Sequence, residues 1–213
     1  MPPPPNLSAA RPRFNVDGAE NTGLAGNLLE LTIVARAGEP CRCNARFVNW
    51  GPASGGTGFL YFDRALLDFG KNFAVTIGAT GAATLFDGRI FGLEAGFPEG
   101  APADIAVLAA DRLEDLRMLR RTRSFEDVSD ADVARRIAGD HGLTADVDLN
   151  GPTHKVLAQI NQSDYAFLYE RVTAAGAMLW IEGRTLHVGN ERALVSAAPR
   201  LVWGEKAFAI APS

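Results

Sequence analysis

The stretch Asn161–Val188 reads NQSDYAFLYERVTAAGAMLWIEGRTLHV and carries the clearest secondary-structure signals in the chain. Ser163 is a good helix N-cap, because its hydroxyl can accept a hydrogen bond from a free backbone N–H of the first turn. Apolar residues then recur at helical spacing up to Ala175, and Gly176 suits the left-handed residue that often ends a helix. Two apolar runs separated by Glu-Gly-Arg follow, so the stretch predicts a helix and then a β-hairpin.

A second helix is predicted upstream of this unit. Ser129 and Asp132 form a capping-box pattern, Val133 and Ile137 supply an apolar stripe, and Gly142 ends the run. β-prone residues at 143–149 and 155–160 separate the two helices. We therefore expect residues 122–190 to form a small α+β domain of two helices and a β-hairpin, and residues 191–213 to form a C-terminal segment.

Residues 11–121 have a different character, because short β-prone runs follow one another at close spacing. Strands are expected at 13–16, 28–35, 41–50, 71–77, 83–97 and 104–110, and the segments 21–27 and 51–58 are expected to be loops. This pattern predicts a small antiparallel β-barrel or sandwich. The fold class is therefore α+β, a mainly antiparallel β-barrel with the small domain appended. Four consecutive prolines mark residues 1–10 as a disordered Pro-rich arm.

The composition is that of a globular protein, with 47% hydrophobic and 22% charged residues among 213. A net charge of -4 gives no electrostatic case for nucleic-acid binding. Four arginines between Arg117 and Arg123 are flanked by acidic residues, so we interpret them as a solvated or subunit-facing run. No apolar run reaches the ~20 residues of a membrane helix, and the N-terminus lacks the features of a signal peptide.

No metal or cofactor site is expected. Cys41 and Cys43 lie two residues apart on one strand, where a disulfide between them would be strained. A zinc site needs about four ligands, and His141, His154 and His187 have no metal-binding spacing relative to the two cysteines. We expect two free thiols.

No catalytic residue is expected either. The sequence contains neither a Gly-x-Ser-x-Gly elbow nor a His-Glu-x-x-His motif. Asp130, Asp132 and Asp140 are interpreted as cap and solvated-face residues. His141 should assist a helix C-terminus, and His187 should lie on the surface of a strand.

Two further features have a functional and a structural interpretation. The three tryptophans, Trp50, Trp180 and Trp203, are more typical of core or interface anchors than of sugar-binding platforms. The Gly-rich segment 51–58 could cradle a phosphate, but it lacks the Gly-Lys-Ser/Thr ending and no helix is expected after it.

Six segments resemble, in the same order, the contractile-tail hub proteins, namely the late control protein D family of phages and the valine–glycine-repeat spike proteins of type VI secretion. The segments are 11–18, 85–93, 109–117, 121–130, 162–168 and 201–205. The most specific is Gln-Ser-Asp-Tyr-Ala-Phe-Leu at 162–168. The resemblance implies a tail-hub type of β-barrel and a structural, non-enzymatic role.

The resemblance also implies partners and a location. Family members assemble as trimers that form a pseudo-hexameric ring between tail tube and spike, so tail tube, spike and baseplate wedge proteins are the expected partners. The expected location is a virion tail or phage-like particle assembled in the bacterial cytoplasm. The chain stops at Ser213, where the family begins a second barrel. A small-molecule-binding split barrel and a tail-associated peptidoglycan hydrolase remain the alternatives.

Overall fold

A computed structural model describes residues 11–36, 38–53, 56–78, 83–190, 201–203 and 206–208, the last two ranges by their backbone only. Its contacts divide the chain into two units. The first unit contains residues 11–34, 42–110, 201–203 and 206–208, and the second contains 35–41 and 111–190, as far as these ranges are described. The predicted Pro-rich arm and most of the C-terminal segment lie outside the described residues.

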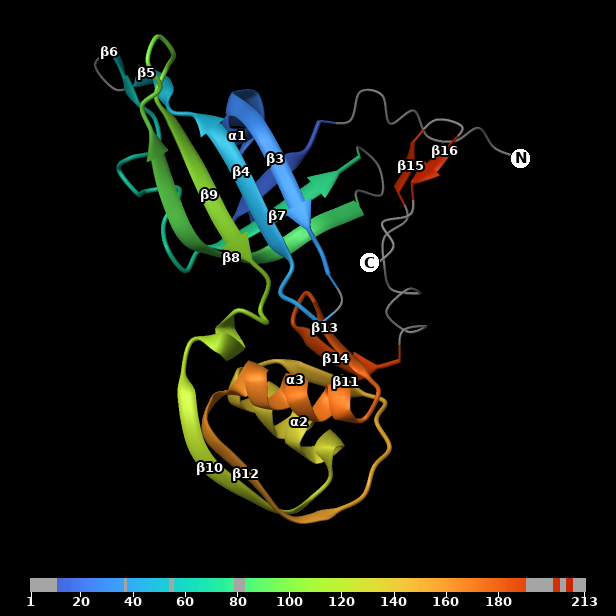
Figure 1. The fold of residues 1–213 in the computed structure, drawn as a ribbon. Helices are drawn as coiled ribbons and strands as arrows, with labels where there is room; N and C mark the ends of the chain where they lie inside the picture. The colour runs from blue at the N-terminus through green and yellow to red at the C-terminus, as the bar shows by residue number, and fades with distance from the viewer. Residues whose placement is uncertain are drawn as a thin grey trace. The chain divides into compact units, whose positions relative to one another are not determined.

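The first unit is built on a seven-stranded antiparallel sheet in the order β2-β1-β7-β8-β9-β4-β3 (Figure 1). Its strands are β1 (Arg13–Val16), β2 (Ala19–Glu20), β3 (Leu28–Val34), β4 (Arg42–Val48), β7 (Asn72–Ile77), β8 (Ala83–Gly96) and β9 (Asp104–Ala110). The alternation in the sequence decides which face turns inward. In β4, Cys43, Ala45 and Phe47 are buried, whereas Arg42 and Asn44 are exposed.

The predicted barrel is not closed in the described part of the chain, because β2 and β3 end the strand order and no ladder joins them. The sheet is nevertheless bent along β8, which pairs first with β7 and then with β9. Arg89 marks the change, since it lies opposite both Asn72 and Ala110. A bulge between Ile90 and Gly92 allows the strand to bend there.

Aromatic rings fill the interior of this bent sheet. Phe14 and Phe47 meet edge to face with their centroids 5.1 Å apart, and Phe73 lies 5.8 Å from Phe14. All three side chains are fully buried. Gly88 permits β8 and β9 to approach, because a Cβ atom at this position would lie 2.1 Å from the carbonyl oxygen of Ala110.

Two segments expected to be loops are ordered structure. Helix α1 (Thr22–Asn27) occupies the first, since the Asn21 side chain accepts a hydrogen bond from the backbone N–H of Leu24 and the Leu24 side chain is buried. The second, the Gly-rich segment, forms a two-stranded hairpin of β5 (Trp50–Ala53) and β6 (Gly56–Phe59). Glycine content alone gave the wrong prediction for both.

The second unit contains the two predicted helices, α2 (Asp130–Asp140) and α3 (Asp164–Ala174). Both caps are confirmed. Ser129 and Asp132 form a complete capping box, and the Ser163 hydroxyl accepts a hydrogen bond from the backbone N–H of Ala166. The predicted hairpin is β13 (Met178–Glu182) and β14 (Thr185–Gly189), and β11 (Thr144–Val147) joins it parallel to β14.

A second ladder in this unit was not predicted as such. β10 (Arg120–Val128) pairs antiparallel with β12 (His154–Ser163), and Figure 1 shows the two strands curving together beside the helices. Only Phe125 of β10 is buried, so the strand has no apolar alternation that a sequence pattern could detect. Before β10, Leu113, Leu116 and Leu119 follow helical spacing, but this segment forms only the 3-10 turn η2 (Asp115–Arg117).

One hydrophobic core holds the second unit together. α2, α3, β10, β12 and the β11-β14-β13 sheet all contribute to it, and Phe125 stacks on Phe167 with the ring centroids 5.8 Å apart. Separately, β15 (Leu201–Trp203) pairs antiparallel with β16 (Lys206–Phe208). No helix in the described residues has both the length and the apolar character needed to cross a bilayer.

Candidate functional site

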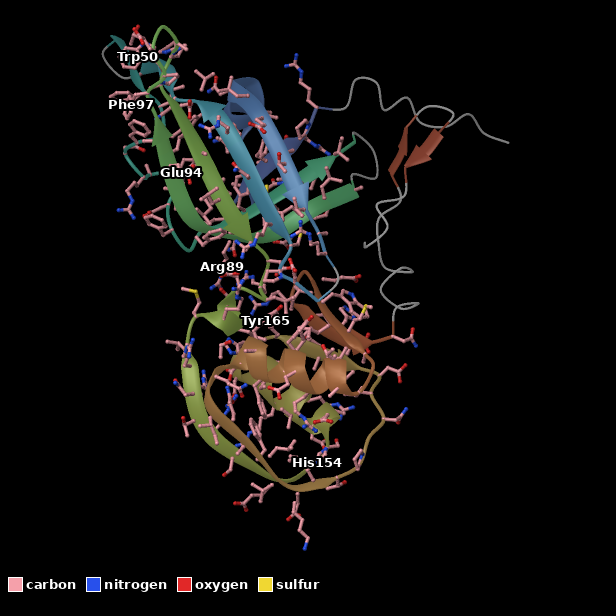
Figure 2. The ribbon with its side chains drawn as sticks, in the orientation of Figure 1. Trp50, Arg89, Glu94, Phe97, His154 and Tyr165 are labelled. Carbon is pink, nitrogen blue, oxygen red and sulfur yellow. The ribbon has the colours of Figure 1, made fainter. Side chains whose placement is uncertain are left out.

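The first unit carries a group of aromatic side chains, which we call the aromatic patch: the exposed Trp50, Phe59, Phe69 and Phe97, and the partly buried Phe62. Phe59 is its centre, with ring centroids 5.2 Å from Trp50, 4.8 Å from Phe62 and 6.2 Å from Phe97. Figure 2 shows Trp50 and Phe97 at the same end of the unit, beside the β5–β6 hairpin. The exposed fractions are 44% for Trp50, 48% for Phe59, 54% for Phe69 and 68% for Phe97.

Buried polar contacts hold the patch in place. Asn49 precedes β5 and is fully buried, and its side-chain oxygen accepts hydrogen bonds from the backbone N–H groups of Leu60 and Tyr61. These bonds close the base of the hairpin, where Trp50 and Phe59 are cross-strand neighbours. The exposed rings are therefore fixed to an ordered scaffold.

A pocket of about 200 Å³ adjoins the patch. Its lining includes Phe62 and Phe69 from the patch, together with Tyr61, Arg64, Leu93, Glu94, Ala95 and Ile105. The volume is below the roughly 300–1,000 Å³ of most small-molecule sites. Such a pocket suits one apolar side chain better than a separate ligand.

The second unit contains a buried charge network centred on Asp164, the first residue of α3. Only 1% of the Asp164 side chain is exposed. It accepts hydrogen bonds from Arg123 Nη2 at 2.8 Å and Gln159 Nε2 at 2.9 Å, and its Oδ2 lies 2.8 Å from His141 Nε2. Arg121 Nε lies 3.3 Å from the same oxygen. Arg121 and Arg123 belong to β10, Gln159 belongs to β12, and His141 is the C-cap of α2. The network therefore ties β10, β12, α2 and α3 together.

These contacts set the protonation state of Asp164. Burial alone would raise the pKa of this carboxyl group. The hydrogen bonds from Gln159 and His141 and the charges of Arg123 and Arg121 outweigh burial, so the pKa is lowered from its usual value. Asp164 is therefore ionised at neutral pH, and its charge is balanced within the fold.

A second buried carboxylate lies at the start of α2. Asp130 receives two hydrogen bonds from the Arg171 guanidinium, at 2.7 and 3.1 Å, and His154 Nε2 lies 3.1 Å from Arg171 Nη2. This pair joins the first turn of α2 to α3. Two nitrogens of the Arg171 guanidinium, Nε and Nη2, contact the two oxygens of Asp130, and such a two-point pair favours a structural role.

Several sequence-based assignments need correction here. The interpretation of Asp130 as a cap or solvated residue is wrong, because its carboxylate is buried against Arg171. The arginine run is only partly solvated, since Arg121 and Arg123 contact Asp164. His187 is not a plain surface residue, because its ring stacks on Trp180 at 5.2 Å.

Other assignments are confirmed. Asp132 is a cap residue, Asp140 is exposed beside Arg123, and His141 is the C-cap of α2. The contact of His141 with Asp164 was missed. No local pattern could reveal it, because the two residues are 23 positions apart and meet only through the packing of α2 on α3.

The two cysteines are free thiols, Cys43 buried and Cys41 partly so. Burial, together with the charge of Asp111, raises the pKa of Cys41 to about 12. Among the described residues, no three His, Cys, Asp or Glu side chains are grouped in a way that could hold a metal ion. Of the tryptophans, Trp50 is in the aromatic patch and Trp180 is partly buried, while the side chain of Trp203 lies outside the description.

Comparison with known families gives one match. The family model of the Alg8 N-terminal domain matches residues 56–211. No curated protein matches the sequence.

Several solved structures share the fold. A 43 kDa tail protein of prophage MuSo2 from Shewanella oneidensis matches with a TM-score of 0.67 at 13% identity, over 85% of this chain and 53% of that protein. The Escherichia coli protein c3393, a type VI secretion component, matches with a TM-score of 0.59 at 12% identity, over 84% of this chain and 49% of that protein. A tail protein from Neisseria meningitidis matches with a TM-score of 0.59 at 14% identity, over 84% of this chain and 50% of that protein. The chain spans about half the length of these proteins, and identities this low establish a shared fold alone.

Proposed function

The chain belongs to the Alg8 N-terminal domain family, and from its fold we propose that it is a structural component of a phage tail or phage-like injection particle. More narrowly, it is a baseplate hub protein that joins the tail tube to the central spike. The family description names a domain and gives it no role in a tail. The tail role is therefore supported by the fold.

One observation carries the proposal. The match to a phage tail protein covers 85% of this chain, so it includes residues of both the bent antiparallel sheet and the small α+β domain, in the same order. Two different architectures in the same order are harder to match by chance than one common superfold. The six hub-like segments span the same two units, and the resemblance to late control protein D proteins supports the narrower hub role.

The remaining expectations form part of the proposal. Residues 11–121 are the hub domain and residues 122–190 the small domain, and the chain carries no catalytic, cofactor or metal residues. It self-associates into a cyclic ring, a trimer or pseudo-hexamer, and contacts tube, spike and wedge proteins. Elemental analysis of untagged protein tests the metal expectation, and stoichiometric zinc or iron would overturn it.

The alternatives have weaker support. The small-molecule alternative rests on the β-rich first unit, and the pocket beside the aromatic patch in that unit is smaller than most small-molecule sites. A peptidoglycan hydrolase needs an acid or nucleophile that is available to substrate, and the buried carboxylates Asp164 and Asp130 are instead paired with arginines. Zymography on cell-wall material checks the second alternative directly, and a cleared zone that depends on this chain would refute the non-enzymatic role.

Assembly is the decisive test. Light scattering across a dilution series should show concentration-dependent self-association of three-fold symmetry or its six-fold extension, strengthened by tail-tube or spike protein. A ring must close, so its contacts run head to tail. A tight two-fold dimer that is unaffected by tail proteins would contradict the hub role. A genetic test asks whether the neighbouring reading frames encode tail-tube, spike and baseplate wedge proteins, as the hub role predicts.

A further inference from the structure

The aromatic patch exposes about as much apolar area as the largest patch on a typical monomer, and such patches are often functional. A phenylalanine or tryptophan side chain presents roughly 150–250 Å². With the exposed fractions given above for Trp50, Phe59, Phe69 and Phe97, the patch exposes roughly 400 Å² of ring surface. That is about half of the ~800 Å² that each partner contributes to a standard interface. Exposed apolar surface on this scale marks interaction sites.

The first unit exposes a second, smaller apolar group on β3, at the end of the sheet. Leu29 is 56% exposed and Val34 is 40% exposed. Leu29 is the extra residue of a β-bulge, since Leu28 and Glu30 are paired with consecutive residues of β4. Apart from Phe91, over whose ring the Arg42 guanidinium lies, the exposed large apolar side chains described in this unit belong to β3 or to the aromatic patch.

Apart from the bulge at Leu29, the edge of β3 carries little of the usual protection against pairing. Natural edge strands are commonly very short or carry proline, lysine or a cluster of charges. β2, at the other end of the sheet, has two residues, but β3 has seven, with no proline or lysine and with Glu30 as its only charged residue. In the described residues, no other strand pairs with its outer edge.

The two groups are separate surfaces of different chemistry. In the sheet, β9 and β4 lie between β8, which leads to Phe97, and β3. One group is a set of rings beside a pocket of about 200 Å³, and the other is a strand edge carrying small aliphatic side chains. A pocket of that size has room for an aliphatic side chain such as that of Leu29. A head-to-tail contact requires two such unlike surfaces on each subunit.

We infer that the aromatic patch of one copy of this chain binds the β3 edge of the next copy. The occupant of the patch is thus a second copy, and the contact is heterologous. This inference rests on the proposed ring-forming function and specifies which surfaces build the ring. In this contact, the aromatic rings supply most of the apolar area. The backbone N–H and C=O groups on the outer edge of β3, with which no described strand pairs, provide directional contacts around the rings.

Two variants separate the surfaces. The patch variant is Trp50→Ser with Phe97→Ser, and the edge variant is Leu29→Lys with Val34→Lys. All four side chains are substantially exposed, so the fold should tolerate the changes. The matched control is Val156→Ser with Ile160→Ser, which removes two equally exposed apolar side chains from β12 in the second unit. Sedimentation velocity of the full chain measures self-association.

The patch and edge variants should each weaken self-association by roughly a hundredfold, on the basis of about tenfold or more for each interface anchor lost. The control should associate like the unmodified chain. Mixing the two variants is the sharper measurement. Each variant keeps one intact surface, so the mixture should form one-to-one dimers that cannot grow further.

Other results would overturn the inference. If the mixture stays monomeric, or if the control weakens association as much as the other variants, the two surfaces do not form the contact, although the hub function could still stand. If the unmodified chain is monomeric at every concentration and tail-tube protein does not change this, the ring itself is refuted, and the proposed function fails with it.

Discussion

The two units of this chain bury different chemistry. The first has an interior of closely packed phenylalanines with an arginine–carboxylate pair, Arg46 and Asp104, and leaves further aromatic rings in solvent. The second builds two arginine–carboxylate pairs into its packing, at Asp130 and Asp164, and its described residues expose no comparable group of rings. In the first unit, one set of aromatic rings fills the core and a separate set lies on the surface, so the exposed rings are not core residues that failed to pack. They occupy a defined surface while other rings fill the core.

The largest expected effect concerns the core of the first unit. Phe47→Ala should lower the free energy of unfolding of that unit by about 3–5 kcal/mol, because it leaves a cavity against Phe14. Phe97→Ala removes an equal side chain from the exposed patch and should cost well under about 1 kcal/mol. Denaturant melts compare the two. Similar losses would mean that the patch is part of the folding core.

The next effect tests the charged interior of the second unit. Asp164→Asn should destabilise this unit by about 2–4 kcal/mol, below the upper range for a buried pair because Arg121 and Arg123 are partly exposed. Asp140→Asn, which alters an exposed partner of the same arginines, should cost about 0–1 kcal/mol. Equal costs for the two variants would show that burial of Asp164 adds nothing.

Acid should act on the same group. The folded pKa of Asp164 is lowered, so its stabilising contribution is present above the ordinary aspartate pKa and is lost as the pH falls through the lower folded value. The unmodified second unit should therefore lose stability below about pH 4, and Asp164→Asn should flatten that dependence. If the stability of the variant fell with pH as steeply as that of the unmodified chain, groups other than Asp164 would be responsible for the acid sensitivity.

For Asp111 we expect the opposite dependence of stability on pH. Burial raises its pKa to about 7, despite hydrogen bonds from the backbone N–H groups of Cys41 and Leu113. The folded state then holds a proton that the unfolded state releases, so stability should fall as the pH rises from about 4 to about 7, by roughly 1–3 kcal/mol. Thermal melts of the unmodified chain and Asp111→Asn across this range would reveal the effect as a difference in slope.

The smallest effect compares the two helix caps. Ser163→Ala should cost roughly 0.5–2 kcal/mol, since α3 loses the acceptor for the Ala166 N–H. Ser129→Ala should cost at least as much, because it dismantles a capping box in which Asp132 also contacts the Ser129 backbone. Unchanged denaturation midpoints in both variants would deny the caps a role in stability.

The sequence predicted best those elements whose signals lie within a few neighbouring residues. Helices α2 and α3 begin at Ser129 and Ser163 because a hydroxyl followed by an apolar stripe is a short-range signal. Strand β9 was also located at its observed bounds, since it is an unbroken apolar run bounded by a turn. These elements are decided by their own residues.

Features that depend on distant partners were not predictable. β10 was missed because it pairs with β12 and buries little beyond Phe125. The burial of Asp164 was missed because its partners come from other elements. The aromatic patch joins residues 50 to 97 and exists only once β8 and the hairpin have folded. In each case the deciding contact is tertiary, so no window of sequence contains it.

The membership of residues 35–41 in the second unit has a consequence for how genes could exchange this domain. Tyr165 donates a hydrogen bond to the carbonyl oxygen of Gly38, the backbone N–H of Asp111 donates to the carbonyl oxygen of Cys41, and the N–H of Cys41 donates to the Asp111 carboxylate. A gene fragment starting at residue 111 would therefore encode a unit lacking these partners. Recombination can transfer the second unit intact only together with the β3–β4 connection, so the two units should be inherited as one block.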